Sequence, residues 1–215
     1  MPRTFAIGDI HGSIGKLEDL IRAITPGKDD TLIFLGDYID RGDSPVRVVG
    51  FLIDLSTRIH CVFLRGNHED MFLEYLEHGR NKGIFFANGG IRTMVDYAKD
   101  AKSLSHYELA KRIPLSHRGF YADLRWYYED EKYIYVHAGI TPHVPPENNR
   151  KDSLIWIRDE FIFSPTGLEK KVIFGHTPFT RPLVKPDKIG IDTGAIYGGP
   201  LTAVELPQEE FIQAE

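Results

Sequence analysis

The chain has 215 residues, 42% of them hydrophobic and 27% charged, and a formal net charge of -5. This composition is typical of a globular domain, and the acidic balance disfavours a general nucleic-acid or anionic-membrane binder, so any anion site must be local. The single cysteine, Cys61, excludes an internal disulfide framework, and no run of about 18 apolar residues predicts a membrane-spanning helix. Because the first residues do not resemble a secretory leader, we expect a cytoplasmic location.

Short apolar runs recur along the chain, and each ends at a polar or glycine-rich segment. Runs of this length that are rich in β-branched and aromatic residues predict buried strands. The predicted strands are TFAI, TLIFL, CVFL, YIYV, KVIF, IGI and LTAVEL, which begin at residues 4, 31, 61, 133, 171, 189 and 201. We further expect the aromatic segment 125–136 to form a hairpin that packs in the core.

Helical patterns separate the early strands. Apolar residues recur at helical spacing in residues 14–23, and residues 45–55 repeat the pattern with a proline near the start, where it is tolerated. Alternation of strands and helices predicts an α/β fold. Residues 70–130 are mostly helical in pattern, and we expect them to form a cap beside the sheet within a single domain spanning residues 1–215.

The polar segments share one position, because each directly follows a predicted strand. They are GDIHG at 8–12, GDYIDRG at 36–42, RGNHE at 65–69, HAG at 137–139 and GHT at 175–177. In open α/β sheets, ligands bind beyond the carboxyl ends of the strands. We therefore expect these five loops to converge on one site.

The side chains that would converge have the chemistry of a mixed nitrogen and oxygen site for divalent metals. Asp9 and His11, one residue apart at a strand end, would face one ion. Asp37 has two carboxylate oxygens and can bridge two ions. The second ion would be completed by Asn67, His137 and His176. Two ions about 3.5–4 Å apart polarise a phosphoryl group and produce hydroxide at neutral pH.

His68 directly follows Asn67, and neighbours on a tight loop usually point apart, so we assign it a different role. We expect His68 to protonate the leaving oxygen as a general acid. Asp40 would accept its other N–H, fix the ring and raise the pKa of the imidazole.

Three arginines are candidates for binding the substrate phosphate. The planar guanidinium group matches two phosphate oxygens at a time, and it would stabilise charge that develops on them. The candidates are Arg41, Arg65 and Arg158. For Arg65 and Arg158, a surface salt bridge is the alternative.

Together these motifs resemble the phosphoprotein phosphatase family of metallophosphoesterases. GDIHG, GDYIDRG and GNHE are similar to its three signature motifs, and HAGI and GHTP are similar to its later histidine motifs. The likeness is greatest to the bacterial and lambda-phage type of serine/threonine phosphatase. It extends over residues 4–206, and NGGIRTMVDY, LIWIRDEF and IDTGAIYGG also resemble that branch.

The resemblance implies an α/β calcineurin-like metallophosphoesterase fold, with a central β-sandwich flanked by helices. It implies the same two metal sites, the same His68–Asp40 acid pair and the same three phosphate-binding arginines. Two divalent ions are implied as cofactors, with manganese expected first and iron or zinc as alternatives. The implied reaction is direct attack by a metal-bound hydroxide, without a phosphoenzyme.

Three further residues have two readings each. Glu69 would support the metal site or be a helix N-terminal carboxylate. Asp192 would hydrogen-bond a ligand histidine or form a simple turn. Tyr197 in AIYGG would line the pocket or lie outside it.

We expect a phosphomonoesterase that acts on phosphoserine and phosphothreonine, and also phosphotyrosine as an open possibility. The expected partner is a phosphoprotein or phosphopeptide, with no nucleic acid and no membrane, and the oligomeric state is left open. The alternatives are a symmetrical dinucleoside-polyphosphate hydrolase, a nuclease and a catalytically silent binding module. We rank the hydrolase lower because it should need additional residues to hold a second nucleotide.

Overall fold

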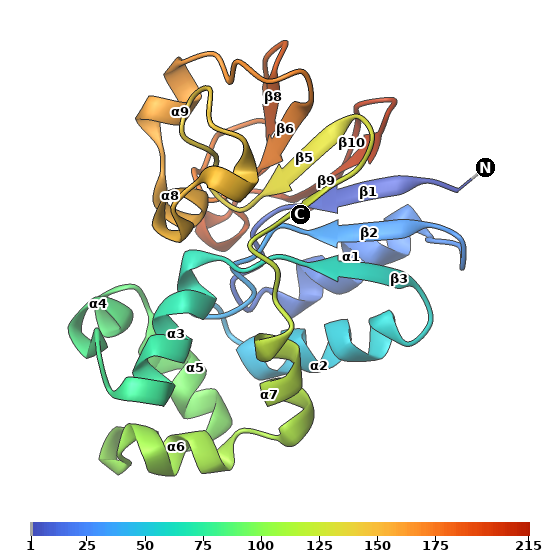
Figure 1. Ribbon diagram of the computed structural model, residues 1–215. Helices are drawn as coiled ribbons and strands as arrows, with labels where there is room; N and C mark the ends of the chain where they lie inside the picture. Colours follow the sequence, from blue (N-terminus) through green and yellow to red (C-terminus); the bar gives the residue numbers. More distant parts are fainter. Residues whose placement is uncertain (1) are drawn as a thin grey trace.

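Two five-stranded β-sheets lie face to face in the computed structural model, which describes residues 2–215 (Figure 1). The first sheet has the order β10-β9-β1-β2-β3 and the second the order β4-β5-β6-β8-β7. The first comprises β1 (Thr4–Ile7), β2 (Thr31–Phe34), β3 (His60–Phe63), β9 (Leu201–Leu206) and β10 (Glu210–Ala214). The second comprises β4 (Tyr127–Glu129), β5 (Tyr133–Val136), β6 (Lys171–Phe174), β7 (Leu183–Val184) and β8 (Lys188–Gly190).

All seven predicted strands are present, and each begins within one residue of its expected start. The antiparallel pairing of β4 with β5 confirms the hairpin at 125–136. Only β7 and β10 were not anticipated. β7 has two residues and β10 is largely exposed, so neither has the buried apolar run that predicts a strand.

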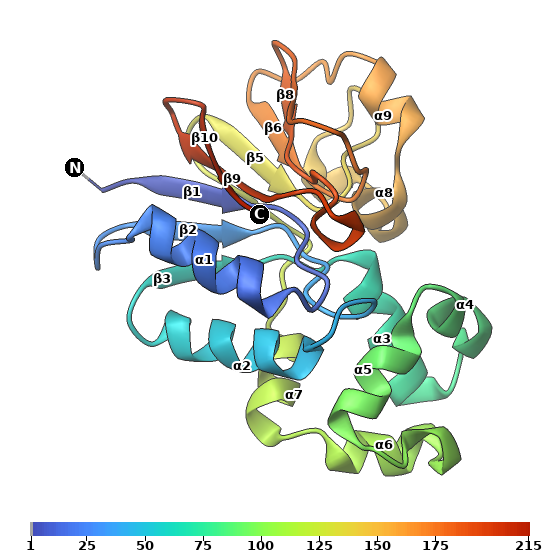
Figure 2. The ribbon, with the colours of Figure 1, turned by 180° about the vertical axis from the view of Figure 1, so that it is seen from behind.

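Helices cover the outer faces of both sheets. α1 (Ile14–Ile24) and α2 (Pro45–Ser56) pack on the first sheet, as the view from behind shows (Figure 2). α8 (Lys151–Trp156) and α9 (Asp159–Phe163) pack on the second sheet. The central β-sandwich flanked by helices is thereby confirmed. No helix within residues 2–215 is long and apolar enough to cross a membrane.

The space between the sheets is filled by side chains from the inner faces of both. Because side chains alternate across a strand, Phe5 and Ile7 face the helices while Ala6 faces the second sheet. Ile33, Val62 and Val204 continue the inner face of the first sheet. The second sheet contributes Tyr135, Ile173 and Ile189. This apolar layer fixes how the two sheets are placed relative to each other.

Helices dominate the segment after the third strand. They are α3 (Asn67–His78), α4 (Lys82–Ala87), α5 (Gly90–Tyr97), α6 (His106–Arg112) and α7 (Leu115–Ala122), with the 3-10 turn η1 (Ala101–Ser103) between α5 and α6. Aromatic packing holds them together: the Phe72 ring stacks on Tyr97 at 6.0 Å and meets Tyr121 edge-on at 5.4 Å. Two further 3-10 turns are η2 (Pro146–Asn148) and η3 (Ala195–Tyr197).

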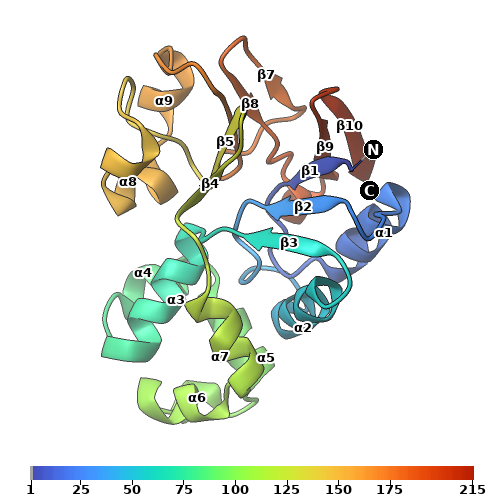
Figure 3. The ribbon, with the colours of Figure 1, turned by 45° about the vertical axis from the view of Figure 1, so that its right-hand side comes forward.

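Strand register brings the functional loops to one edge of the sandwich. β1, β2 and β3 run parallel and in register, with Ile7 opposite Phe34 and Phe34 opposite Phe63. β5, β6 and β8 are also parallel. In Figure 3 the arrowheads of β2 and β3 point toward the side where α3 and α8 lie. The polar segments therefore leave their strands at a common edge.

We predict that Ile33→Ala lowers the free energy of unfolding by about 2–5 kcal/mol, because it opens a cavity between the sheets. Val184→Ala is the matched control, since Val184 is 53% exposed and should change stability by less than about 0.5 kcal/mol. Chemical denaturation measures both. Equal effects of the two changes would contradict the importance of this layer.

Candidate metal centre

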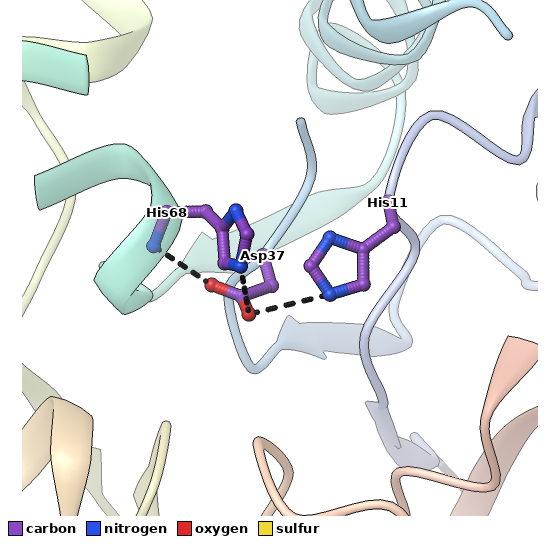
Figure 4. A group of neighbouring side chains, drawn as sticks. All are labelled: His11, Asp37 and His68. Atoms are coloured by element: carbon purple, nitrogen blue, oxygen red, sulfur yellow. Dashed lines mark hydrogen bonds and ion pairs between the residues drawn. The ribbon is translucent and has the colours of Figure 1, made fainter. Parts of the chain in front are cut away.

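The Asp37 carboxylate lies at the middle of the site, between imidazole rings (Figure 4). Its Oδ2 is 3.4 Å from Nε2 of His11, and its Oδ1 is 3.4 Å from Nε2 of His137. The backbone N–H of His68 donates to Oδ1 at 3.1 Å. Two groups of close metal-binding atoms share this carboxylate, namely His11–Asp37–His68 and Asp37–His137–His176. Asp37 is thus placed to face two ions at once.

The two imidazoles beside Asp37 present lone pairs to it. Nδ1 of His11 lies 2.9 Å from the carbonyl oxygen of Ile39, and Nδ1 of His137 lies 2.9 Å from that of Leu35. A carbonyl only accepts, so each Nδ1 carries the proton and each Nε2 is bare. Lone pairs facing a carboxylate need a cation between them. This donor set therefore fits divalent metal ions.

The pKa values agree with neutral imidazole ligands. Burial lowers the pKa of His11 to about 3, and burial lowers that of His176 to about 2. Burial also outweighs the nearby Asp37 charge and lowers the pKa of His137. Nε2 of His176 is buried without a hydrogen-bond partner among residues 2–215. An unpartnered ring nitrogen in this position is available to a metal.

Asn67 and His137 also present two acceptors to each other. Oδ1 of Asn67 lies 3.0 Å from Nε2 of His137, whose proton is on the other nitrogen. Asn67 is the first residue of α3, so the helix fixes its direction. With the His137 and His176 rings 5.0 Å apart, the three predicted ligands of the second ion are close together.

Asp9 joins the two sheets at the site. Both of its carboxylate oxygens accept the backbone N–H of His176, at 3.1 and 3.0 Å. Burial raises the pKa of Asp9 well above its usual value, and the charges of Asp192 and Asp37 raise it further. Several buried carboxylates gathered in this way create negative charge that a divalent cation would balance. Asp9 stays the predicted partner of His11 on the first ion.

Glu69 has a structural role that sequence reasoning left open. It is fully buried, and its carboxylate accepts the backbone N–H groups of Asp37 and Tyr38 at 2.9 Å and of Gly66 at 3.0 Å. Burial, together with the Asp37 charge, raises its pKa to about 8. Glu69 therefore ties the loop after β2 to the start of α3. Its place in the first turn of α3 agrees with the helix N-terminal carboxylate that we considered from sequence.

His68 and Asp40 are hydrogen-bonded. Nδ1 of His68 lies 2.7 Å from Oδ2 of Asp40, and Thr93 of α5 binds the other carboxylate oxygen. Burial lowers the pKa of His68, but the Asp37 and Asp40 carboxylates outweigh it, so the pKa is raised overall. Nε2 of His68 has no hydrogen-bond partner in the described chain and lies 3.9 Å from Oδ2 of Asp37. The geometry suits a proton donor; its role in catalysis stays a prediction.

Of the three predicted phosphate-binding arginines, two line the cavity at the metal centre. Arg41 and Arg158 lie there with Asp37. Arg65 instead pairs with Asp70 at 2.7 Å and stacks over the Trp126 ring at 4.7 Å. This ion pair is the salt bridge that we considered as the alternative for Arg65, with Asp70 as its partner; phosphate binding by Arg65 stays a prediction.

Asp192 and Tyr197 also line this cavity. Burial raises the pKa of Asp192 to about 6 despite the hydrogen bond that it accepts from the backbone N–H of Gly194. The Tyr197 hydroxyl lies 2.7 Å from Nη1 of Arg41, which also lies 3.2 Å from Nε2 of His11. Tyr197 therefore lines the pocket, the first of the two positions that we considered from sequence.

Unusual backbone conformations concentrate at the site. Nine non-glycine residues of the described chain have positive φ, and five of these are candidate site residues: His11, Asp37, Asp40, Arg41 and His176. Each such residue costs on the order of 1–3 kcal/mol unless its surroundings impose it. Glycine is required at Gly66, where an added Cβ would collide with Asp37 and Glu69. The loops are therefore shaped for the site at a cost in stability.

The strand ends of this sandwich gather imidazoles and carboxylates that fit divalent metal ions, as expected for a metal-dependent phosphoesterase. The profile of the calcineurin-like phosphoesterase family matches residues 2–206, and the chain belongs to that family.

Relatives with two different activities are similar to the chain. Bis(5'-nucleosyl)-tetraphosphatase PrpE (asymmetrical) of Oceanobacillus iheyensis is 24% identical, over 96% of this chain and 89% of its own length. Serine/threonine-protein phosphatase 1 of Salmonella typhimurium is 27% identical, over 94% of this chain and 91% of its own. A crystal structure of a candidate diadenosine tetraphosphatase has a TM-score of 0.74 and 25% identity, covering 100% of this chain and 95% of that one.

We predict that Glu69→Gln lowers the free energy of unfolding by about 1–3 kcal/mol, because an amide cannot accept all of the backbone N–H groups that the carboxylate satisfies. Metal affinity should fall as well, since the Asp37 loop loses its support. Glu77→Gln is the matched control on the same helix, where the side chain is 63% exposed. Thermal unfolding and metal titration test this, and a variant indistinguishable from Glu77→Gln would contradict it.

We predict that His68→Asn keeps two metal ions but lowers kcat about 10²–10⁴-fold for a substrate with a basic alkoxide leaving group, as expected for the loss of a general acid. Asp37→Asn should instead lose metal together with activity. Metal content by mass spectrometry and steady-state kinetics separate the two cases. Loss of metal from His68→Asn would make His68 a ligand, an outcome that its place in the His11–Asp37–His68 group allows.

Proposed function

We propose that this protein hydrolyses dinucleoside tetraphosphates asymmetrically, giving a nucleoside triphosphate and a nucleoside monophosphate. The observation that carries the proposal is the similarity to the Oceanobacillus iheyensis tetraphosphatase, which covers 96% of this chain and 89% of that protein. A dinucleotide substrate does not require a much longer chain, contrary to our expectation from sequence, because the similarity covers 89% of that relative's length. That relative is named as an asymmetrical tetraphosphatase, whereas the alternative that we considered from sequence was symmetrical.

The chain supplies binding and proton transfer for this reaction. When bound, two divalent ions would polarise the phosphoryl group and lower the pKa of water; Asp9, His11, Asp37, Asn67, His137 and His176 are the residues that would hold them. Arg41 and Arg158 line the same cavity and would bind phosphate oxygens. Water oxygen becomes bonded to phosphorus as the bond to the bridging oxygen breaks.

His68 would donate a proton to the departing group. Asp40 holds the Nδ1–H, which leaves Nε2 of His68 as the nitrogen that can donate toward the cavity. A departing phosphate has a pKa of about 6 and leaves readily without a proton. A serine alkoxide is far more basic and needs one. The acid is therefore more important for a phosphoprotein than for a dinucleotide.

Hydrolysis of phosphoserine and phosphothreonine is the second candidate function. It is favoured by the buried His68–Asp40 pair and by the 27% identity to the Salmonella typhimurium serine/threonine phosphatase. Both functions would use the same ions and the same arginines. Only the part of the substrate beyond the phosphate differs.

We predict that the manganese-loaded protein cleaves diadenosine tetraphosphate with a kcat/KM at least about tenfold above that for phosphopeptides, p-nitrophenyl phosphate and its diester, a preference worth about 1.4 kcal/mol. Chromatography should show ATP and AMP as products. Asp37→Asn is the control for contaminating activity. Two molecules of ADP would indicate symmetrical cleavage, and a preference for phosphopeptides would transfer the proposal to the second candidate.

A further inference from the structure

The cavity at the metal centre is too small for a whole nucleotide. Its volume is about 140 Å³, and its lining includes Asp37, Asn67, His68 and His176. Pockets that enclose an organic ligand usually measure about 300–1,000 Å³. The cavity can hold a phosphoryl group, but a nucleoside attached to that group must lie outside, at the mouth.

Two exposed aromatic side chains line this same cavity. Trp156 is 39% exposed and Tyr197 is 66% exposed. Trp156 ends α8, which packs on the second sheet, whereas Tyr197 ends η3, just before β9 of the first sheet. Exposed aromatic surface has no stabilising role in a core. Because these side chains lie beside the predicted metal ligands, we expect them to contact a part of the bound substrate.

Both aromatic rings are fixed by contacts to the site itself. The Trp156 ring meets His176 edge-on, with ring centroids 6.0 Å apart and an interplanar angle of 86°. The Tyr197 hydroxyl is hydrogen-bonded to Nη1 of Arg41, and the Arg41 guanidinium lies 5.7 Å from the ring centroid. Each ring is thereby linked to a residue that binds either metal or phosphate.

We propose that Trp156 and Tyr197 form a site for a nucleobase, the one attached to the phosphate chain held by Arg41 and Arg158. The inference rests on the proposed function and deepens it by assigning the residues that recognise the nucleoside. A purine or pyrimidine offers a flat π face, and aromatic side chains bind such faces by stacking. The side chains of phosphoserine and phosphothreonine have no such flat π face.

The test compares the binding of ATP with that of tripolyphosphate, which has the same phosphate chain without the nucleoside. Calorimetry on the manganese-loaded protein gives both dissociation constants without depending on turnover. In the wild type, ATP should bind at least about tenfold more tightly than tripolyphosphate. Trp156→Leu and Tyr197→Leu should each reduce that preference by on the order of tenfold, the loss expected for one stacked base.

Conservative and remote variants separate stacking from general damage. Trp156→Phe and Tyr197→Phe keep an aromatic ring and should keep most of the preference for ATP. Phe163→Leu is the matched control, because Phe163 is 77% exposed and lines a different cavity. It should behave as the wild type. Thermal unfolding confirms that each variant is folded.

Two results would overturn the inference. One is equal affinity of the wild type for ATP and tripolyphosphate, and the other is an unchanged preference in both leucine variants. Failure of the proposed function has a different signature: absence of diadenosine tetraphosphate cleavage. A protein that prefers ATP but does not cleave the dinucleotide would have the nucleobase site and another substrate.

Discussion

The site depends on one buried carboxylate that has more acceptors than donors around it. Asp37 faces the bare Nε2 atoms of His11 and His137 from both of its oxygens, at 3.4 Å in each case. Cations between these acceptors would stabilise the arrangement. Glu69 holds the Asp37 backbone N–H, and the Asp37 carbonyl in turn accepts from the backbone N–H of His11 at 2.8 Å. The loops thus fix one another around the position that the ions would take.

The architecture explains why this convergence needs two sheets and a helical segment. β1, β2 and β3 deliver three of the loops, and β5, β6 and β8 deliver the others from the second sheet. The bond from His176 to Asp9 joins the two sides. The helices after β3 contribute as well, since Thr93 of α5 holds Asp40, the partner of His68. Changes in those helices would therefore affect His68, the predicted proton donor, without touching the predicted metal ligands.

The sequence predicted the structure well where buried apolar runs are followed directly by polar residues of the site. Apolar runs predicted the inner strands, and the polar residues that follow them predicted which side chains would meet at the Asp37 carboxylate. It failed where the outcome depends on tertiary neighbours. Nothing in the order of residues says that the partner of Arg65 is Asp70, or that Glu69 accepts backbone N–H groups from the loop after β2 and from Gly66. The exposed strand β10 carries no buried run, so periodicity could not detect it.

The similarity to relatives with two different activities can be understood from the position of the site. The predicted metal ligands, acid pair and arginines would act on a phosphoryl group, and this group is common to phosphoproteins and dinucleotides. A cavity of about 140 Å³ contacts little else. Discrimination between substrates must then arise at the mouth, where Trp156 and Tyr197 are exposed. This is consistent with relatives of two different activities, at 24% and 27% identity to this chain.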